Sequence, residues 1–279
     1  MRVIHEGLVF PECPRWHNGA LWFSDCHDGR VVAIDSEGRS LESFEVPGGP
    51  AGLGWLPDGR LLVVSIANIC VYRREADGRL VLHADLSSLH RYHTNDMVVD
   101  PAGNAYVGEV AFRIGSEDPR TTSIALVRPD GTVEAATQGV TTPNGSAIAP
   151  DGKTFVVAES WIRRITTFDL LADGKLSNGR LFWQLDVNDI PDGMCLDEEG
   201  NVWAACPFTN SVARVSPTKG VVSRITMDAG RPYACVFGGK DRRELYVCCA
   251  PGHDPDIVRA ARAGRIVVTR LDVGGAGIP

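Results

Sequence analysis

The chain has 279 residues, a formal net charge of −7, 44% apolar and 23% charged residues, a composition typical of globular proteins. No run of Lys and Arg forms the basic stripe expected of a nucleic-acid binder, and no window holds the roughly 18 apolar residues of a membrane span. The N-terminal segment lacks the apolar stretch of a secretory signal, and the eight cysteines show no paired framework. We therefore expect a cytoplasmic protein with reduced cysteines that binds neither nucleic acid nor membranes.

One unit recurs along the chain: an apolar run, a turn that contains glycine, and a second apolar run. The copies in chain order are Trp16–Phe23, Leu56–Val63, Asp100–Val107, Pro150–Val157, Asp197–Trp203 and, more loosely, Gly239–Val247. The turn positions 19, 59, 103, 152, 200 and 241 are separated by steps of 40, 44, 49, 48 and 41 residues. Steps of about 40–50 residues are typical of four-stranded propeller blades.

A second hairpin is expected after each of the first five units, over residues 30–35, 70–82, 124–133, 164–176 and 212–225. The sequence therefore predicts an all-β fold, a six-bladed β-propeller with four antiparallel strands per blade, in which residues 1–279 form one domain. The N-terminal run 2–10 and the C-terminal run 264–272 are expected to share the last blade and close the ring, which removes exposed sheet edges. No helix is predicted, and residues 87–92 are expected to form a single turn.

One residue stands at the same offset before each turn, eight positions back in five units and seven in the first. These residues are Glu12, Ala51, Asn95, Asn144, Asp192 and Tyr233. Equivalent positions of successive blades lie where each innermost strand begins, so they should form a ring around one end of the channel. We call this set the donor ring.

Four members of the donor ring carry oxygen donors: Glu12, Asn95, Asn144 and Asp192. Two carboxylates and two amides suit a hard divalent cation, with calcium favoured over the stricter octahedron of magnesium. The absence of His and Cys from the ring disfavours a typical zinc site. Converging carboxylates would repel one another without a cation between them. The alternative is that Asn144-Gly145 and Asp192-Gly193 are plain turns.

The same residues lie in motifs that resemble the family of the senescence marker protein, gluconolactonase and luciferin-regenerating enzyme, which are six-bladed propellers. The motifs are Pro11-Glu12-Cys13-Pro14-Arg15-Trp16, Asn95-Asp96, Thr142-Pro143-Asn144-Gly145 and Ile190-Pro191-Asp192-Gly193-Met194-Cys195-Leu196-Asp197. The resemblance covers nearly the whole chain. It implies one divalent metal held by Glu12, Asn144 and Asp192, with Asn95 as a fourth ligand or as a contact to metal-bound substrate or water. It also implies Zn²⁺, Mn²⁺ or Mg²⁺ as alternatives to calcium.

Members of the family that this chain resembles hydrolyse lactones, and the related diisopropylfluorophosphatases cleave phosphorus esters. The sequence departs from the family pattern at two places. Cys13 stands where the family usually has glycine, which leaves the ligand Glu12 in place. His93 stands where sugar-lactone members often carry an arginine that contacts the sugar, so specificity for gluconolactone is in doubt.

The expected reaction is hydrolysis of a small-molecule lactone or ester. A bound cation would polarise the carbonyl and stabilise the oxyanion formed when water attacks. Asp192 is the candidate general base, although a carboxylate bound to a cation is a weak base. Direct nucleophilic attack by Asp192 and a nearby histidine as base are the alternatives.

The loops between the second and third strands of each blade should return to the donor-ring end of the channel. Candidate substrate contacts are Asn95 and His93 near the ring and Phe112, Trp161 and His253 on these loops, which also carry His27 and Phe208. The longest loop, Glu109–Thr122, could act as a lid or pocket wall. Three other functions remain open: a phosphotriesterase-like hydrolase, a non-catalytic binding scaffold, and a metal-dependent isomerase or cyclase. The expected assembly is a monomer or a small homo-oligomer.

Overall fold

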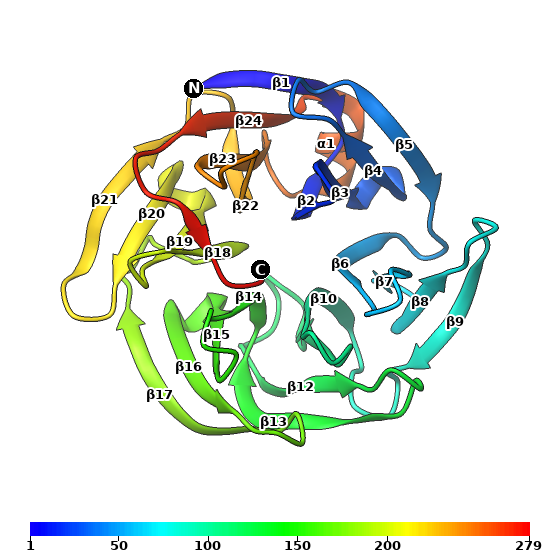
Figure 1. The fold of residues 1–279 in the computed structure, drawn as a ribbon. Coiled ribbons are helices and arrows are strands. Elements are labelled where there is room, and N and C mark those ends of the chain that lie inside the picture. The colour runs from blue at the N-terminus through cyan, green and yellow to red at the C-terminus, as the bar shows by residue number, and fades with distance from the viewer.

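The computed structural model describes all 279 residues, and six β-sheets form a closed ring around a central channel (Figure 1). In each sheet the strand that comes first after the preceding blade faces the channel, and the next strands lie progressively further out. Strands that follow one another in the chain pair in antiparallel fashion, because short turns join them. The predicted six-bladed β-propeller is therefore confirmed.

The first three blades occupy residues 11–141. Blade 1 contains β2 (Pro11–His17), β3 (Ala20–Asp25), β4 (Arg30–Ile34) and β5 (Ser40–Glu45). Blade 2 contains β6 (Pro50–Trp55), β7 (Leu61–Ser65), β8 (Cys70–Arg74) and β9 (Leu80–Asp85). Blade 3 contains β10 (His93–Val99), β11 (Ala105–Val110), β12 (Thr121–Val127) and β13 (Val133–Thr141).

The last three blades complete the ring. Blade 4 contains β14 (Pro143–Ile148), β15 (Thr154–Glu159), β16 (Arg164–Leu170) and β17 (Leu176–Gln184). Blade 5 contains β18 (Met194–Asp197), β19 (Val202–Cys206), β20 (Ser211–Ser216) and β21 (Gly220–Thr226). Blade 6 contains β22 (Arg231–Gly238), β23 (Glu244–Ala250), β24 (Gly264–Arg270) and, outermost, β1 (Arg2–Leu8).

The ring is closed by the two ends of the chain, as the sequence predicts. Strand β1 pairs with β24 from Arg2 opposite Val268 to Leu8 opposite Gly264, so blade 6 is built from both termini. The five turn glycines used to count the repeats have positive φ values between 64° and 87°, which glycine adopts without steric cost.

The chain ends inside the ring, which the sequence analysis did not foresee. The short strand β25 (Gly275–Ala276) pairs with Leu196 and Asp197 at the end of β18, and Ile278 pairs with Ile148 at the end of β14. Both partners lie at the opposite end of the innermost strands from the donor ring. The C-terminal tail therefore crosses the far end of the channel, near the centre of the ring in Figure 1.

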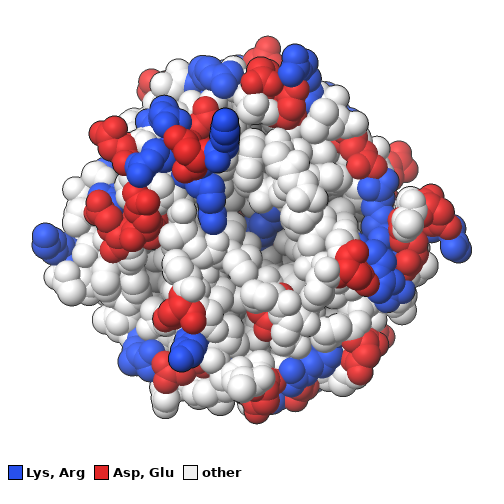
Figure 2. Space-filling view, in the orientation of Figure 1, with Lys and Arg blue, Asp and Glu red and all other residues white.

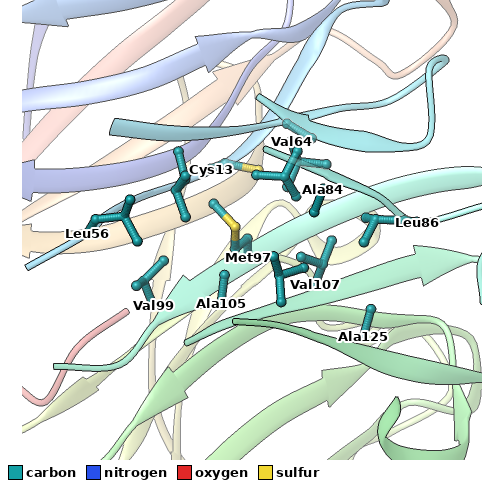
Figure 3. Packing of buried hydrophobic residues seen from close by; sticks show 14 residues of the cluster. Cys13, Leu56, Val64, Ala84, Leu86, Met97, Val99, Ala105, Val107 and Ala125 are labelled. Atoms are coloured by element: carbon teal, nitrogen blue, oxygen red, sulfur yellow. The ribbon is translucent and has the colours of Figure 1, made fainter. Parts of the chain in front are cut away.

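Six hydrophobic clusters fill the six seams between neighbouring blades. Adjacent residues of a strand point to opposite faces, so Val98 packs toward blade 4 while Met97 and Val99 pack toward blade 2. Figure 3 shows the cluster between blades 2 and 3, where Met97 and Val107 meet Val64 and Leu86. Burial at every seam makes the closed ring the state that removes most apolar surface from water.

One expectation about secondary structure is wrong. Residues Pro255–Ala261 form a short helix, α1, between β23 and β24, where only a loop was expected. Asp254 caps it by accepting hydrogen bonds from the amides of Asp256 and Ile257, and Pro255 occupies the first turn. Asp followed by Pro is a helix-start signal, but seven residues with one buried side chain give no helical periodicity. A turn follows β9, where the amides of Leu89 and His90 donate to the carbonyl of Leu86.

Charged side chains of both signs alternate around the rim of the face seen in Figure 2, and no large patch of one sign forms there. All eight cysteines are free and buried, as predicted. Cys248 and Cys249 pack into different seams, because adjacent residues of strand β23 point to opposite faces. No helix in the structure has the length and apolar character needed to span a bilayer.

Candidate active site

The six donor-ring positions occupy equivalent places at the start of the innermost strands. Five of them are the second or third residue of an innermost strand: Glu12 in β2, Ala51 in β6, Asn95 in β10, Asn144 in β14 and Tyr233 in β22. The sixth, Asp192, lies two residues before β18. The strand register shifts at this position in β6, β10, β14 and β22, and directly after it in β2. Such bulges commonly redirect side chains next to active sites.

The glycines that follow the donor-ring residues serve close packing. A Cβ on Gly145 would lie 2.5 Å from the Met194 nitrogen, and one on Gly193 would lie 2.3 Å from the Ala234 Cβ. Neither glycine has a positive φ. Gly193 also joins two blades, since its amide donates to the Tyr233 carbonyl of blade 6 at 2.8 Å and its carbonyl accepts from the Ala205 amide of blade 5 at 3.0 Å. Asn144-Gly145 therefore lies within strand β14 and is not the plain turn considered as an alternative, whereas Asp192-Gly193 forms a bend immediately before β18.

Two carboxylates of the donor ring, Glu12 and Asp192, are partly exposed and close enough to interact electrostatically. Burial raises the pKa of Asp192 to about 7, the Asn144 side chain beside it lowers this pKa, and the Asp96 charge raises it. Burial also raises the pKa of Glu12 well above its usual range, and Asp192 adds to this shift. The Cys13 amide donates to Glu12 Oε2 at 3.0 Å, which opposes it. The structure thus brings Glu12, Asn144 and Asp192 together.

These groups fit a hard divalent cation. The Tyr233 hydroxyl is buried without a hydrogen-bond partner. Burial is the main cause of its raised pKa, and the charges of Asp192 and Glu12 raise this pKa further. A cation between the carboxylates would remove the repulsion that burial enforces. No group of three or more His, Cys, Asp or Glu side chains is placed to hold a metal. An ion here would therefore depend on the amide oxygens of Asn144 and Asn95, as the sequence analysis expects.

A buried ion pair lies next to the donor ring. Arg15 of β2 reaches across to β10, where Nη2 contacts Asp96 Oδ1 at 2.6 Å and also donates to the Met97 carbonyl. Both side chains are less than a tenth exposed. Arg15 thereby neutralises a third carboxylate near Glu12 and Asp192. Both residues lie in the family motifs Pro11–Trp16 and Asn95-Asp96, but neither was expected to have a role in the site.

Three buried carboxylates position the segments that lead into the donor ring. Asp25, Glu109 and Glu159 stand at or next to the ends of the second strands β3, β11 and β15. Asp25 accepts from the Phe10 amide at 2.7 Å, Glu109 from the Tyr92 amide at 2.8 Å, and Glu159 from the Thr141 amide at 2.8 Å. Each donor amide lies two or three residues before Glu12, Asn95 or Asn144. The recurring acid at the end of an apolar run was a sequence signal that the analysis missed.

The backbone beside two donor-ring residues has positive φ without glycine. Cys13 has φ of 50° and Thr142 has φ of 50°, values that a β-branched residue rarely adopts. Both side chains are buried. The conformation of Cys13 explains physically why glycine would suit this position. Strained backbone concentrates at functional sites, where surrounding structure enforces it.

The loops expected at the channel mouth do meet there. Phe112 contacts Trp161 with ring centroids 6.4 Å apart, Trp161 contacts Phe208 at 6.3 Å, and Phe208 contacts His253 at 6.5 Å. These residues come from blades 3, 4, 5 and 6 in turn. Phe112 is buried beneath the loop of residues 111–120, whereas Phe208 and His253 are exposed.

A cavity of about 570 Å³ opens beside the donor ring. Asn95 and exposed His93 line it together with His27, Ile66 and Arg259. The imidazole of His27 stacks on Phe10 with ring centroids 4.8 Å apart, and Phe10 contacts Tyr233 with centroids 4.7 Å apart. The loop after β3 is thus connected to Tyr233 of the donor ring through aromatic contacts. The channel mouth therefore combines a cluster of oxygen donors with an adjoining cavity large enough for a small-molecule ligand.

Fold and site together define a six-bladed β-propeller with acidic and amide side chains gathered at one mouth of its channel. The model of the SMP-30/gluconolactonase/LRE-like region matches residues 10–251. The chain belongs to this family.

Relatives span almost the whole chain. Regucalcin of Bos taurus is 30% identical over 283 aligned residues, which cover 98% of this chain and 95% of the relative. A luciferin-regenerating enzyme superposes with a TM-score of 0.83 at 23% identity, covering 98% of this chain and 95% of the other. A gluconolactonase of Xanthomonas campestris superposes with a TM-score of 0.76 at 21% identity, covering 99% and 88%. At these identities the two structures support the fold alone.

Proposed function

We propose that this protein is a divalent-metal-dependent hydrolase of lactones, with calcium as the favoured ion. One observation carries the proposal: at one channel mouth the carboxylates Glu12 and Asp192, from blades 1 and 5, both have pKa values raised by burial, and the Asp192 charge raises that of Glu12 further. Membership of a family that includes gluconolactonases supports the reaction class. A relative described as a calcium-binding regucalcin, from Agrobacterium tumefaciens, supports the choice of ion.

Glu12, Asn144 and Asp192 would hold the ion, and Asn95 would complete the set or contact the substrate. When bound, a divalent cation polarises a lactone carbonyl and stabilises the oxyanion. Asn144 orients the Asp192 carboxylate from the side. Arg15 keeps Asp96 paired, so that the site contributes two net negative charges and not three.

Asp192 is the proposed general base that takes a proton from the attacking water. Its place in the donor ring beside Asn144 supports this role, because a general base must lie within hydrogen-bond reach of the water that attacks the bound substrate. His93 would contact the substrate at the adjoining cavity, and Trp161, Phe112 and His253 would form its outer wall. Direct attack by Asp192 would instead leave a covalent acyl-enzyme that a rapid-quench experiment can trap.

The test compares hydrolysis of a lactone panel by wild type, Asp192→Asn and Glu12→Gln, each stripped with a chelator and resupplied with Ca²⁺, Mn²⁺, Zn²⁺ or Mg²⁺. Both variants should lose at least about 100-fold in kcat/KM, since each removes charge that holds the ion. Asn95→Ala should lose less. Glu37→Gln changes the same group on the exposed turn of blade 1 and should match wild type.

Four results would contradict the proposal. Full activity after metal removal would exclude the metal, and normal turnover by Asp192→Asn would exclude the assigned base. Cleavage of a phosphofluoridate without cleavage of any lactone would change the bond to a phosphorus ester. The absence of both activities and of any metal effect on stability would favour a binding scaffold.

A further inference from the structure

The six loops at the donor-ring mouth carry one side chain each at nearly the same place, one to three residues after the second strand of the blade. These side chains are His27, Ile66, Phe112, Trp161, Phe208 and His253. We call them the rim collar. Five of the six are aromatic or imidazole rings, and none is a carboxylate, an amide, a lysine or an arginine.

The rim collar forms a nearly continuous wall. Contacts between ring centroids link Phe112, Trp161, Phe208 and His253 at 6.3–6.5 Å, in edge-on or tilted orientations that aromatic pairs prefer. On the other side, burial lowers the pKa of His27, and the charge of Arg259 lowers it further, so the imidazole is neutral at physiological pH. His27 and Ile66 line the same cavity as Asn95. Two members of the collar therefore share a cavity with one member of the donor ring, and the ring contacts continue the collar around the same mouth.

Several polar groups around the collar are already engaged. Asp28 pairs with Arg262 at 3.0 Å and with Arg30 at 2.8 Å, and Arg259 donates its Nε to the His27 carbonyl at 3.1 Å. The Arg231 guanidinium lies 6.0 Å from the centroid of Phe208. Each hydroxyl of a polyhydroxylated lactone would give up its hydrogen bonds to water at this wall. Few protein groups there could replace them, which would weaken binding of such a lactone.

We infer that the rim collar selects lactones bearing an aryl or alkyl substituent over polyhydroxylated sugar lactones. The inference rests on the proposed function, because it assumes that the lactone carbonyl is directed to the donor ring. A planar substituent would lie against Trp161, which is half-buried, and Phe208, which is exposed. Both rings have apolar surface that is open to such a contact. Covering these rings on binding would supply the selectivity.

The test measures kcat/KM for dihydrocoumarin, δ-valerolactone and D-glucono-δ-lactone with the metal-loaded protein. Dihydrocoumarin should exceed D-glucono-δ-lactone by at least about 100-fold, since loss of several hydrogen-bond partners and of apolar contact act together. In Phe208→Ala and Trp161→Ala, the ratio of dihydrocoumarin to δ-valerolactone rates should fall by about tenfold, and Trp161→Phe should recover most of it. Leu181→Ala removes an exposed apolar side chain on the outer strand β17 and should leave the ratio unchanged.

A binding arm separates this inference from the proposed function. The dissociation constant of coumarin, which has the planar ring but resists hydrolysis, should rise by about tenfold in Phe208→Ala. If no lactone is hydrolysed but coumarin binds with this dependence, the proposed reaction is wrong and the collar assignment stands. D-glucono-δ-lactone hydrolysis equal to or faster than that of dihydrocoumarin would overturn the collar assignment and leave the proposed function intact. Coumarin binding that is absent, or indifferent to Phe208, would also overturn it.

Discussion

Gly145 and Gly193 set how closely the innermost strands of blades 4, 5 and 6 approach one another. A methyl group at Gly193 would lie 2.3 Å from the Ala234 Cβ and 2.7 Å from its Cα, distances that only a shift of the backbone can relieve. The side chains of Asn144 and Asp192 are attached to the residues immediately before these glycines. Their positions in the donor ring therefore depend on the missing Cβ atoms.

We expect Gly193→Ala to lower the free energy of unfolding by about 1–3 kcal/mol, the usual cost of overpacking, in urea denaturation. Lactonase kcat/KM should fall by more than about tenfold, because a displacement of about 1 Å at Asp192 misplaces the reacting groups. Gly252→Ala is the matched control, since a Cβ there meets no heavy atom within 4 Å and the backbone has an ordinary φ. Equal losses in both variants would contradict the argument.

Arg15 gives a second prediction at the residue scale. Arg15→Met leaves Asp96 buried without its partner beside two other carboxylates, which should cost about 3–5 kcal/mol of stability in metal-free protein. Calcium should recover part of this loss, because a cation offsets the added negative charge. Thermal unfolding with calcium and with a chelator measures both effects. Arg15→Lys keeps the charge and should lose less; a metal-free Arg15→Met protein as stable as wild type would refute the role of the pair.

At the scale of elements, the C-terminal tail joins three blades. The Ile278 amide and carbonyl exchange hydrogen bonds with Ile148 of blade 4, the Gly274 carbonyl accepts from Glu198 of blade 5, and the Gly275 amide donates to the Arg242 carbonyl next to blade 6. The tail therefore connects blades 4, 5 and 6 by hydrogen bonds at the end of the channel opposite the donor ring.

Deletion of residues 274–279 should lower stability by a few kcal/mol, since each lost backbone hydrogen bond contributes about 1 kcal/mol. Catalytic activity at low temperature should be affected less than stability, because the tail and the donor ring lie at opposite ends of the channel. Differential scanning calorimetry and lactonase assays on the same preparations measure the two effects. Removal of Pro279 alone keeps the Ile278 pairing and serves as the control. An unchanged melting temperature after the longer deletion would show that the tail adds no stability.

The elements that the sequence predicted and those that it did not differ in length and in repetition. The four-stranded blades recur with glycine turns at steady spacing, so each copy supports the interpretation of the next. Strand β25 has two residues and α1 has seven, and neither recurs. Their positions depend on tertiary contacts, such as Arg262 with Asp28 for the helix and Ile278 with Ile148 for the tail, which no local pattern encodes.

At the scale of the whole molecule, an ion bound by the donor ring would join distant blades. Calcium should raise the melting temperature by several degrees, because a ligand at 100 times its dissociation constant adds about 2.7 kcal/mol to the stability of the folded state. A chelator should reverse the shift. Glu12→Gln should abolish most of it while the far-UV circular dichroism spectrum stays that of the wild type. A calcium shift that persists in Glu12→Gln would place the ion elsewhere.

The candidate site was predictable to the extent that it follows the sixfold repeat. Equal offsets from the turns brought out Glu12, Asn144 and Asp192, and the structure gathers these three. The Arg15–Asp96 pair spans 81 positions and two blades, so nothing local joins its members. The supporting carboxylates, such as Glu159, were missed because an acid at a strand end is ordinarily solvated, and only the closed ring buries it.

The distribution of thiols has a practical consequence. Buried cysteines lie in four of the six seams: Cys13 between blades 2 and 3, Cys206 between blades 4 and 5, Cys248 between blades 6 and 1, and three more between blades 5 and 6. An alkylating reagent reaches them only when the corresponding seam parts. The rate at which each cysteine is labelled, measured by peptide mapping over time, would therefore rank the seams by how often each one opens locally. The measurement needs no mutation and no attached dye.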